Sequence, residues 1–253
     1  MVQAWPRGDY LYVPASLDAA IRDAQSIGNQ ITALVAAADV EVVPAPPVGI
    51  LRRVICGTGF ELNGRFFNED TFAAAIALKV NGVQYWADVT LAPDDGSEAD
   101  HSIWLLPGEA LIAALAAAVT TNPVNCFLGW IDEQLSFGSV LRGEIPDLNP
   151  VTVIPAPPAG KTRQVFTGSE TAAAGDSSIY NPDAIAHNFT IRVNDNGTPR
   201  KANEISVGAG SDRRFGDELL TVGENQSVEI VMNEAVNTTA PRFVSSYREN
   251  PTS

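Results

Sequence analysis

Short stretches in which apolar and polar residues alternate recur through most of the chain. Residues 189–193 alternate throughout, and residues 227–232 alternate for part of their length. A period of two turns one set of side chains toward a core and the other toward solvent, as in a strand of a half-buried sheet. Asn81, Gly82 and residues 194–197 supply the residue types that tolerate the positive φ of tight hairpins. The pattern therefore predicts antiparallel sheets joined by hairpins.

This pattern occurs twice in the same order. Residues 43–49 read VPAPPVG, residues 154–160 read IPAPPAG, and the frame continues with Arg52 beside Arg163. Self-similarity of this kind indicates a repeated structural unit. Further matches follow with small drifts in spacing; they are 67–70 with 180–183, 78–81 with 191–194, 108–109 with 223–224, and 130–132 with 247–249.

The repeat sets the domain boundaries. The proline-rich stretch at the start of each copy favours an extended backbone outside a sheet, and the turn residues of 145–150 mark the end of the first copy. We therefore predict a mainly β protein with two tandem antiparallel β-sandwich modules, Ig-like or jelly-roll-like, at 41–150 and 151–253. A short N-terminal arm and an α-helix at 1–40 precede them.

One segment gives conflicting signals. Residues 109–119 are rich in alanine and favour a helix by propensity, whereas their repeat partner, residues 224–232, favours a strand. We let the repeat decide and predict a strand in both copies.

The first forty residues follow a different pattern. After Ser16, a plausible N-cap, apolar residues are spaced three and four apart from Leu17 to Ala38, which predicts a helix with one apolar stripe. That stripe needs a partner, which is either the protein's own sandwich or other copies in a trimer or similar homo-oligomer. The preceding arm carries aromatic residues that suit docking on a partner protein. The candidate partner-binding residues are Trp5, Tyr10, Tyr12, Leu17, Ile27, Ile31 and Leu34.

Composition narrows the range of partners. Acidic residues outnumber basic ones by 30 to 16, and the net charge of -14 disfavours nucleic acid and anionic lipid. The longest apolar run, residues 111–119, is far too short to span a bilayer, and no secretory signal is recognised. Cys56 and Cys126 are the only cysteines, and we expect two buried free thiols.

The residues give no pattern for catalysis, metal or cofactor binding. His101 and His187, the only histidines, have no second ligand at short spacing, and no phosphate-binding glycine motif is complete. The acidic run 94–100 lacks the ligand order of a known calcium loop and suits a solvated hairpin tip. We therefore expect no cofactor, no metal and no enzymatic activity.

The second copy resembles the β-sandwich modules of minor virion proteins in tailed bacteriophages. The resemblance rests on residues 157–165, 180–183, 190–198 and 222–224. It implies a head decoration or fibre component anchored by its N-terminal segment, assembled in the host cytoplasm and carried in the virion, with capsid or tail proteins as partners.

Two alternatives stay open. One is a tail- or neck-associated structural protein. The other is a carbohydrate-binding sandwich used in host adsorption, which would present Trp86, Trp104 or Trp130 to a host-surface glycan. Because Trp86 and Trp104 lie in strand-like stretches, core packing is the favoured use of these two side chains.

Overall fold

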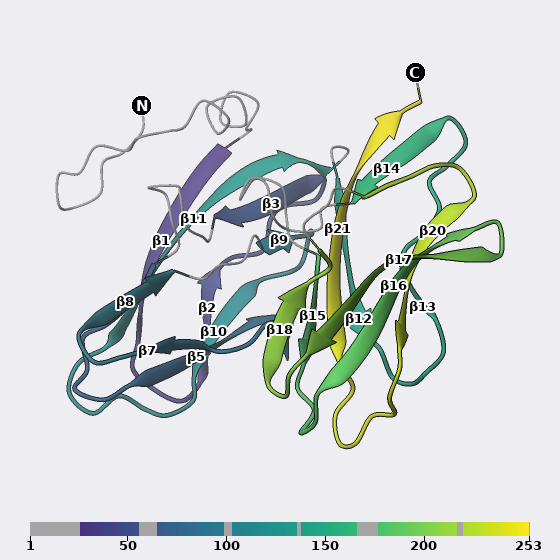
Figure 1. The fold of residues 1–253 in the computed structure, drawn as a ribbon. Coiled ribbons are helices and arrows are strands. Elements are labelled where there is room, and N and C mark those ends of the chain that lie inside the picture. The colour runs from purple at the N-terminus through teal and green to yellow at the C-terminus, as the bar shows by residue number, and fades with distance from the viewer. Residues whose placement is uncertain are drawn as a thin grey trace.

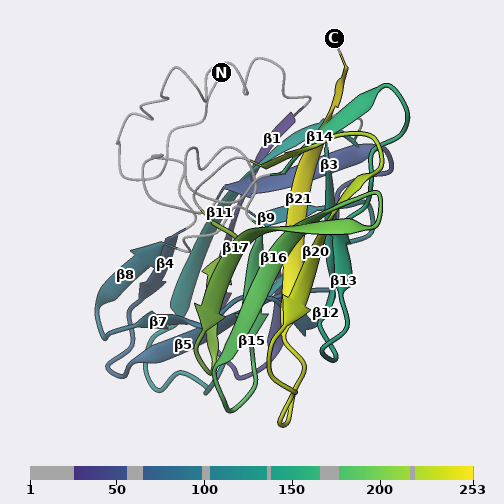
Figure 2. The same cartoon turned by 45° about the vertical axis from the view of Figure 1, so that its right-hand side comes forward.

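The computed structural model describes residues 26–55, 65–98, 103–135, 138–165, 177–216 and 220–252. These residues form antiparallel sheets and no α-helix, which confirms the predicted β-sandwich class (Figures 1 and 2). We refer to β1 to β11 as the first half and to β12 to β21 as the second half.

The strands of the first half are β1 Ser26–Leu34, β2 Asp39–Val43, β3 Ile50–Ile55, β4 Arg65–Asn68, β5 Ala74–Val80, β6 Val83–Gln84, β7 Val89–Leu91, β8 Asp95–Glu98, β9 Ile103–Leu105, β10 Leu111–Leu115 and β11 Val124–Gln134. The strands of the second half are β12 Ser139–Glu144, β13 Val151–Ile154, β14 Lys161–Val165, β15 Ser178–Asn181, β16 His187–Asp195, β17 Thr198–Val207, β18 Ser211–Arg214, β19 Leu220–Val222, β20 Gln226–Met232 and β21 Arg242–Pro251.

The strand order of the first half recurs in the second half. In the first half, one sheet runs β8-β4-β11-β3-β9 with β1 on the other side of β11, and its partner runs β2-β10-β5-β6 with β7 also on β5. In the second half, one sheet runs β18-β15-β21-β14-β19 with β12 on β21, and its partner runs β13-β20-β16-β17. Each strand of one half thus has a counterpart in the other, and β17 takes the place of β6 and β7 together.

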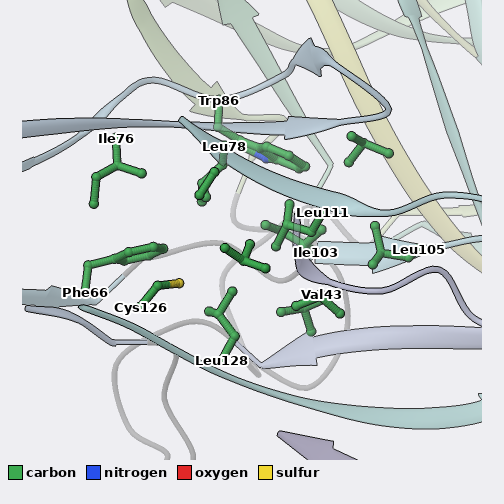
Figure 3. Packing of buried hydrophobic residues seen from close by; sticks show 14 of the residues in the cluster. Val43, Phe66, Ile76, Leu78, Trp86, Ile103, Leu105, Leu111, Cys126 and Leu128 are labelled. Atoms are coloured by element: carbon green, nitrogen blue, oxygen red, sulfur yellow. The ribbon is translucent and has the colours of Figure 1, made fainter. Parts of the chain in front are cut away.

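Each half has its own hydrophobic core. The first contains Phe66, Trp86 and Leu128, all at most 1% exposed, between the two sheets (Figure 3). The second contains Phe189 and Ile230, both fully buried. Burying one such side chain stabilises the fold by roughly 1.5–3 kcal/mol, so the apolar set of the alternating pattern contributes directly to the packing of the two sheets.

Local predictions from the repeat and from turn chemistry hold. Residues 111–115 form β10, a strand paired with β2 and β5, despite their helix propensity. Asn81 and Asn196 adopt φ of 50° and 49° and are each followed by a glycine with positive φ, as tight hairpins require. The acidic run differs from the predicted hairpin tip: among its described residues, 94–98, Asp94 lies in the turn and residues 95–98 pair with β4 as β8.

The predicted N-terminal helix is wrong where it can be tested. Residues 26–34 form β1, which pairs along its whole length with β11. Glycine and β-branched residues weaken a helix. In the strand, Gly28 lies against the indole ring of Trp130, where a Cβ atom would have no room, so this position requires a glycine. The rest of the predicted helix, up to residue 25, lies outside the described residues.

The two halves pack against each other through the outer face of the sheet that contains β12 and β21. Val140 on β12 and Val244 on β21 belong to the core cluster of the first half. The buried side chain of Arg142 pairs with Glu109 at 2.6 Å and donates a hydrogen bond to the backbone carbonyl of Trp104. Burial lowers the pKa of the Arg142 guanidinium, and Glu109 opposes that shift.

Candidate functional site

Among the predicted partner-binding residues, Ile31 and Leu34 have described side chains, and these two lie on opposite faces of β1. Trp5, Tyr10, Tyr12 and Leu17 lie outside the described residues. Successive side chains of a strand point to opposite sides, so Ile31 and Leu34 are separated by β1 itself. Leu34 is 1% exposed in the core, whereas Ile31 is 53% exposed on the outer face. Ile27 belongs to the same strand, and its side chain lies outside the described part of the structure.

The tryptophans proposed for glycan stacking have structural roles. Trp86 and Trp104 are each 1% exposed within the first core, which confirms the predicted packing role of these two side chains. Trp130 is half-buried, and its ring lies under the guanidinium of Arg52 at 4.8 Å. These three rings therefore form no open platform for a sugar.

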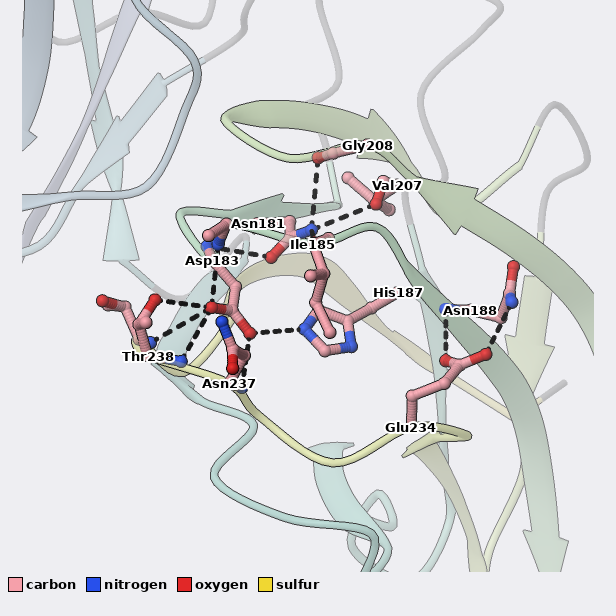
Figure 4. Close-up of polar contacts among 12 residues, drawn as sticks. Asn181, Asp183, Ile185, His187, Asn188, Val207, Gly208, Glu234, Asn237 and Thr238 are labelled. Atoms are coloured by element: carbon pink, nitrogen blue, oxygen red, sulfur yellow. Dashed lines mark hydrogen bonds and ion pairs between the residues drawn. The ribbon is translucent and has the colours of Figure 1, made fainter.

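The most concentrated polar site in the described residues is the carboxylate of Asp183, in the turn between β15 and β16 (Figure 4). The residue is 1% exposed. Its Oδ1 accepts hydrogen bonds from the backbone N–H and the hydroxyl of Thr238 at 2.8 and 2.6 Å, and its Oδ2 accepts one from the N–H of Asn237 at 2.7 Å. Both donors belong to the loop between β20 and β21, so one carboxylate holds that loop.

We call the Asp183 carboxylate, bonded to Asn237 and Thr238, the clamp of the second half. Asn181, at the end of β15, also belongs to it. Its side-chain oxygen accepts a hydrogen bond from the N–H of Asp183 at 3.1 Å, and its Nδ2 donates to the carbonyl oxygens of Ile185 at 2.8 Å and Val207 at 3.1 Å. The amide thereby satisfies backbone carbonyl groups of the same turn and of β17. Asn181 itself is fully buried.

His187, at the start of β16, adds a second group to the carboxylate. Its Nε2 lies 2.8 Å from Oδ2 of Asp183, and both side chains are fully buried (Figure 4). Its Nδ1 has no hydrogen-bond partner among the described residues. A histidine held by a carboxylate is the orienting pair of many catalytic bases, but here solvent reaches neither group.

The first half contains the same clamp without the histidine. Asp70 accepts hydrogen bonds from the backbone N–H of Thr120 at 2.7 Å and from the hydroxyls of Thr120 and Thr121 at 2.8 Å each. Asn68 bonds the N–H of Asp70 and donates to the carbonyl of Ala92 at 3.0 Å, as Asn181 does in the second half. Where the second half has His187, the repeat places Ala74.

Both clamp carboxylates have lowered pKa values. For Asp70 the main cause is the hydrogen bond from the backbone of Thr120, which outweighs the opposing effect of burial. For Asp183 burial is the largest effect and would raise the pKa, but the hydrogen bonds of Thr238, Asn237 and His187 together outweigh it. Each carboxylate is therefore held in its charged, acceptor-only form.

A second device also occurs in both halves. Arg52 makes two hydrogen bonds to Asp132, at 2.7 and 2.8 Å, and donates a third to the carbonyl of Pro44 at 2.8 Å. In the second half Arg163 bonds Glu249 at 3.0 and 2.6 Å and the carbonyl of Pro155 at 2.6 Å. This second guanidinium lies 4.4 Å from the ring centroid of Tyr247, as the first lies over Trp130.

The repeat in the sequence already aligned the residues of both arrangements, but the sequence alone gave no role to the aspartates or the arginines. The repeat aligned residues 67–70 with 180–183 and Arg52 with Arg163. The spacing Asn-x-Asp at the same place in both copies was the available signal. The partners of the carboxylates, such as Thr121 and Thr238, lie far along the chain and only the fold brings them together.

Other predicted features can be placed only in part. Cys126 is 1% exposed in the first core, while Cys56 and His101 lie outside the described residues. Within the described ranges, no group of three histidine, cysteine or acidic residues is placed to hold a metal ion. The part of the chain that is described also contains no helix with the length and apolarity needed to cross a membrane.

No protein-family model matches the chain, and no curated protein sequence matches it. Solved structures do resemble it. They include PNGase F, a glycosylasparaginase from Flavobacterium meningosepticum, at 9% identity and a TM-score of 0.33 over 90% of this chain and 96% of that chain. The PBSX exported protein XepA matches at 9% identity and a TM-score of 0.28 over 89% and 87%. At such scores neither likeness carries an argument about activity or partners.

The prediction that the chain is not an enzyme does not stand. It rested on the absence of a recognisable catalytic motif, and the solved structures that resemble the chain include an amidase, which covers 90% of this chain at a TM-score of 0.35. Sandwich folds can carry catalytic residues on separated loops, so a missing local motif excludes no activity.

Proposed function

We propose that the chain is a structural component of a tailed-phage particle, built from two tandem sandwich modules that run from β1 to β11 and from β12 to β21, in place of the predicted bounds 41–150 and 151–253. The observation that carries the proposal is the repeated strand order together with the repeated clamps at Asp70 and Asp183. The resemblance of the second copy to minor virion modules supplies the class of particle.

The polar groups that the two halves share are used to fix loops and proline segments. Asp70 and Asp183 each hold the loop before the last strand of their half, and Arg52 and Arg163 hold the proline stretch that opens it. Groups that are buried and fully bonded favour one defined conformation. A module with its connections fixed in this way suits repeated display on a particle surface.

In this proposal the segment before β1 joins the particle and the sandwiches point away from it. Residues 26–34 are part of the first sheet, so the attaching segment is residues 1–25, which include Trp5, Tyr10, Tyr12 and Leu17. A head decoration or fibre position follows from this order, with a capsid protein as the partner.

The test is to locate the chain in purified particles. Particles released from the host that encodes the chain would be purified by density and probed with an antibody against residues 26–253. We expect the full chain to sediment with the particles and a chain that lacks residues 1–25 to stay in the soluble fraction. A full chain found only in the soluble fraction would reject the virion role, and particle binding by the shortened chain would reject the attaching segment.

A further inference from the structure

Each half contains one hairpin whose two-residue loop is asparagine followed by glycine. Residues 81–82 join β5 to β6, and residues 196–197 join β16 to β17. All four loop residues are exposed. The asparagine and the glycine have φ of 50° and 81° in the first hairpin and of 49° and 85° in the second. The chain therefore presents the same turn twice, in two different surroundings.

An asparagine that precedes glycine is prone to lose its amide group without an enzyme. The backbone nitrogen of the glycine bonds to Cγ of the asparagine, and the C–N bond of the carboxamide breaks. Ammonia leaves with the proton of the glycine N–H, and water then opens the succinimide ring at either carbonyl to give aspartate or isoaspartate. Glycine has no Cβ to hinder the attack, and the space beside Gly82 and Gly197 is open.

The two asparagine side chains differ in one hydrogen bond. Oδ1 of Asn81 accepts a hydrogen bond from the backbone N–H of Ala110 at 3.1 Å, and the N–H of Asn81 donates to the carbonyl of Ala110 at 3.3 Å. Asn196 keeps the backbone bond, to the carbonyl of Asn225 at 3.2 Å. Among the described residues, none forms a hydrogen bond with the Asn196 side chain. The carboxamide is thus tied down in the first hairpin alone.

The turns beside the two hairpins are placed differently. In the first half the turn closes at Glu109, whose N–H donates to the carbonyl of Leu106, and Ala110 follows it. In the second half Asn225 is itself the third residue of the turn that Gln226 closes, and it has φ of 64°. The residue that meets the hairpin therefore lies outside the turn in the first half and inside it in the second.

We propose that Asn196 is a site of spontaneous deamidation and that Asn81 is protected from this reaction by the fold. Ring closure requires the carboxamide to turn back onto its own backbone. At Asn81 the carboxamide must first leave the N–H of Ala110, whereas Asn196 has no such bond to break. Both loops are equally open to the water that completes the reaction.

The product changes the hairpin in two ways. A new carboxylate at residue 196 stands next to Asp195, whose own carboxylate pairs with Arg200 at 3.2 Å. Isoaspartate also adds a methylene group to the backbone of the loop, and loop length fixes the register of a hairpin. Asp195 and Thr198 then lose their pairing, so the reaction loosens the start of β17, the edge strand of its sheet.

The test is peptide mapping of the folded full chain by mass spectrometry during storage in mildly alkaline buffer. Each site is followed by the exchange of its amide for an acid, and chromatography separates aspartate from isoaspartate. The chain unfolded in urea is the control, because dividing by its rates removes the effect of the neighbouring residues. We expect the corrected rate at Asn196 to exceed that at Asn81 by about two- to tenfold, the factor that one net hydrogen bond gives.

Ala110→Pro tests the protecting hydrogen bond directly. Proline has no N–H, so this variant removes the donor to Asn81 and keeps the carbonyl. We expect faster deamidation at residue 81 and an unchanged rate at residue 196, with thermal unfolding to show that the variant is folded. An unchanged rate at residue 81 in the folded variant would reject the protecting bond. In wild type alone, equal corrected rates, a faster reaction at Asn81 or no product at Asn196 would overturn the proposal.

Discussion

The two halves share the buried aspartate carboxylates that fix their loops, and they differ in the side chain that lies next to each carboxylate. Asp70 and Asp183 accept nearly the same set of hydrogen bonds from the loop before the last strand. The second half then adds His187 to its carboxylate, where the first half has Ala74. Because the carboxylate is already satisfied by the loop, the neighbouring position is free to change. Backbone-fixing groups are thus the constant part of this fold, and the positions around them vary.

The contact between the halves should be the most sensitive point of the molecule. Arg142→Ala would leave Glu109 and the carbonyl of Trp104 without their buried partner. Breaking a buried ion pair from one side costs about 3–5 kcal/mol, and chemical denaturation would measure the loss. Arg142→Met, which keeps the packing of the aliphatic part, should lose less. An equal loss in both variants would show that the polar contacts of Arg142, and not the packing of its aliphatic part, carry its contribution.

The strands β1 and β12 should differ in whether they tolerate a side chain opposite an aromatic ring, which is Trp130 on β11 for β1 and Tyr247 on β21 for β12. Gly28 lies opposite Trp130, whereas its counterpart Ser139 lies opposite Tyr247. We expect Gly28→Ser, which copies the second half, to destabilise the protein by about 1–3 kcal/mol through overpacking against the indole. Ala33→Ser on the same strand is the control, because Ala33 is exposed. A stable Gly28→Ser protein would mean that the ring can move aside.

His187 can be exchanged with its counterpart. His187→Ala copies the first half, removes a buried hydrogen bond and leaves a small cavity, and we expect a loss of about 1–3 kcal/mol. Ala74→His, the reverse change, should be tolerated less well than Ala74→Ser, because Ala74 packs against the first core and the larger ring would overpack it. The unfolding free energies of the three proteins give the answer, and unchanged stability in His187→Ala would assign the histidine a role other than holding the clamp.

The clamps should make stability fall in acid. Both carboxylates have folded-state pKa values below their ordinary value of 3.8, so their stabilising contribution is complete above that pH and is lost as the pH falls below it. Asp183→Asn should flatten this acid limb in part, and Asp70→Asn together with Asp183→Asn should flatten it further. Unfolding midpoints measured between pH 5 and pH 2, about the range over which such carboxylates titrate, would test this. An acid limb that both variants leave unchanged would trace it to other groups.

The sequence predicted the sheets better than the sites. Alternation and the repeat identified the strands, including β10, because a period of two and a second copy are properties of the chain alone. The apolar spacing of residues 17–38 led to the wrong prediction of a helix, because apolar residues three and four positions apart also occur in strands. Only the pairing of β1 with β11 decides which faces Ile31 and Leu34 occupy. The clamps were aligned but not recognised, because Asp183 and Thr238 meet through the fold and not through a local motif.

The last strand also constrains how the protein is made. β21, at Arg242–Pro251, is the inner strand of its sheet and pairs with β12, β14 and β15. Because synthesis proceeds from the N-terminus, those three strands leave the ribosome before the strand that joins them. The first half, whose inner strand β11 ends at Gln134, can close while the remainder is still being translated. The second half can close only after β21 itself has left the ribosome, and the surface around Trp104 stays open until then, which makes the nascent chain the stage most exposed to misassembly.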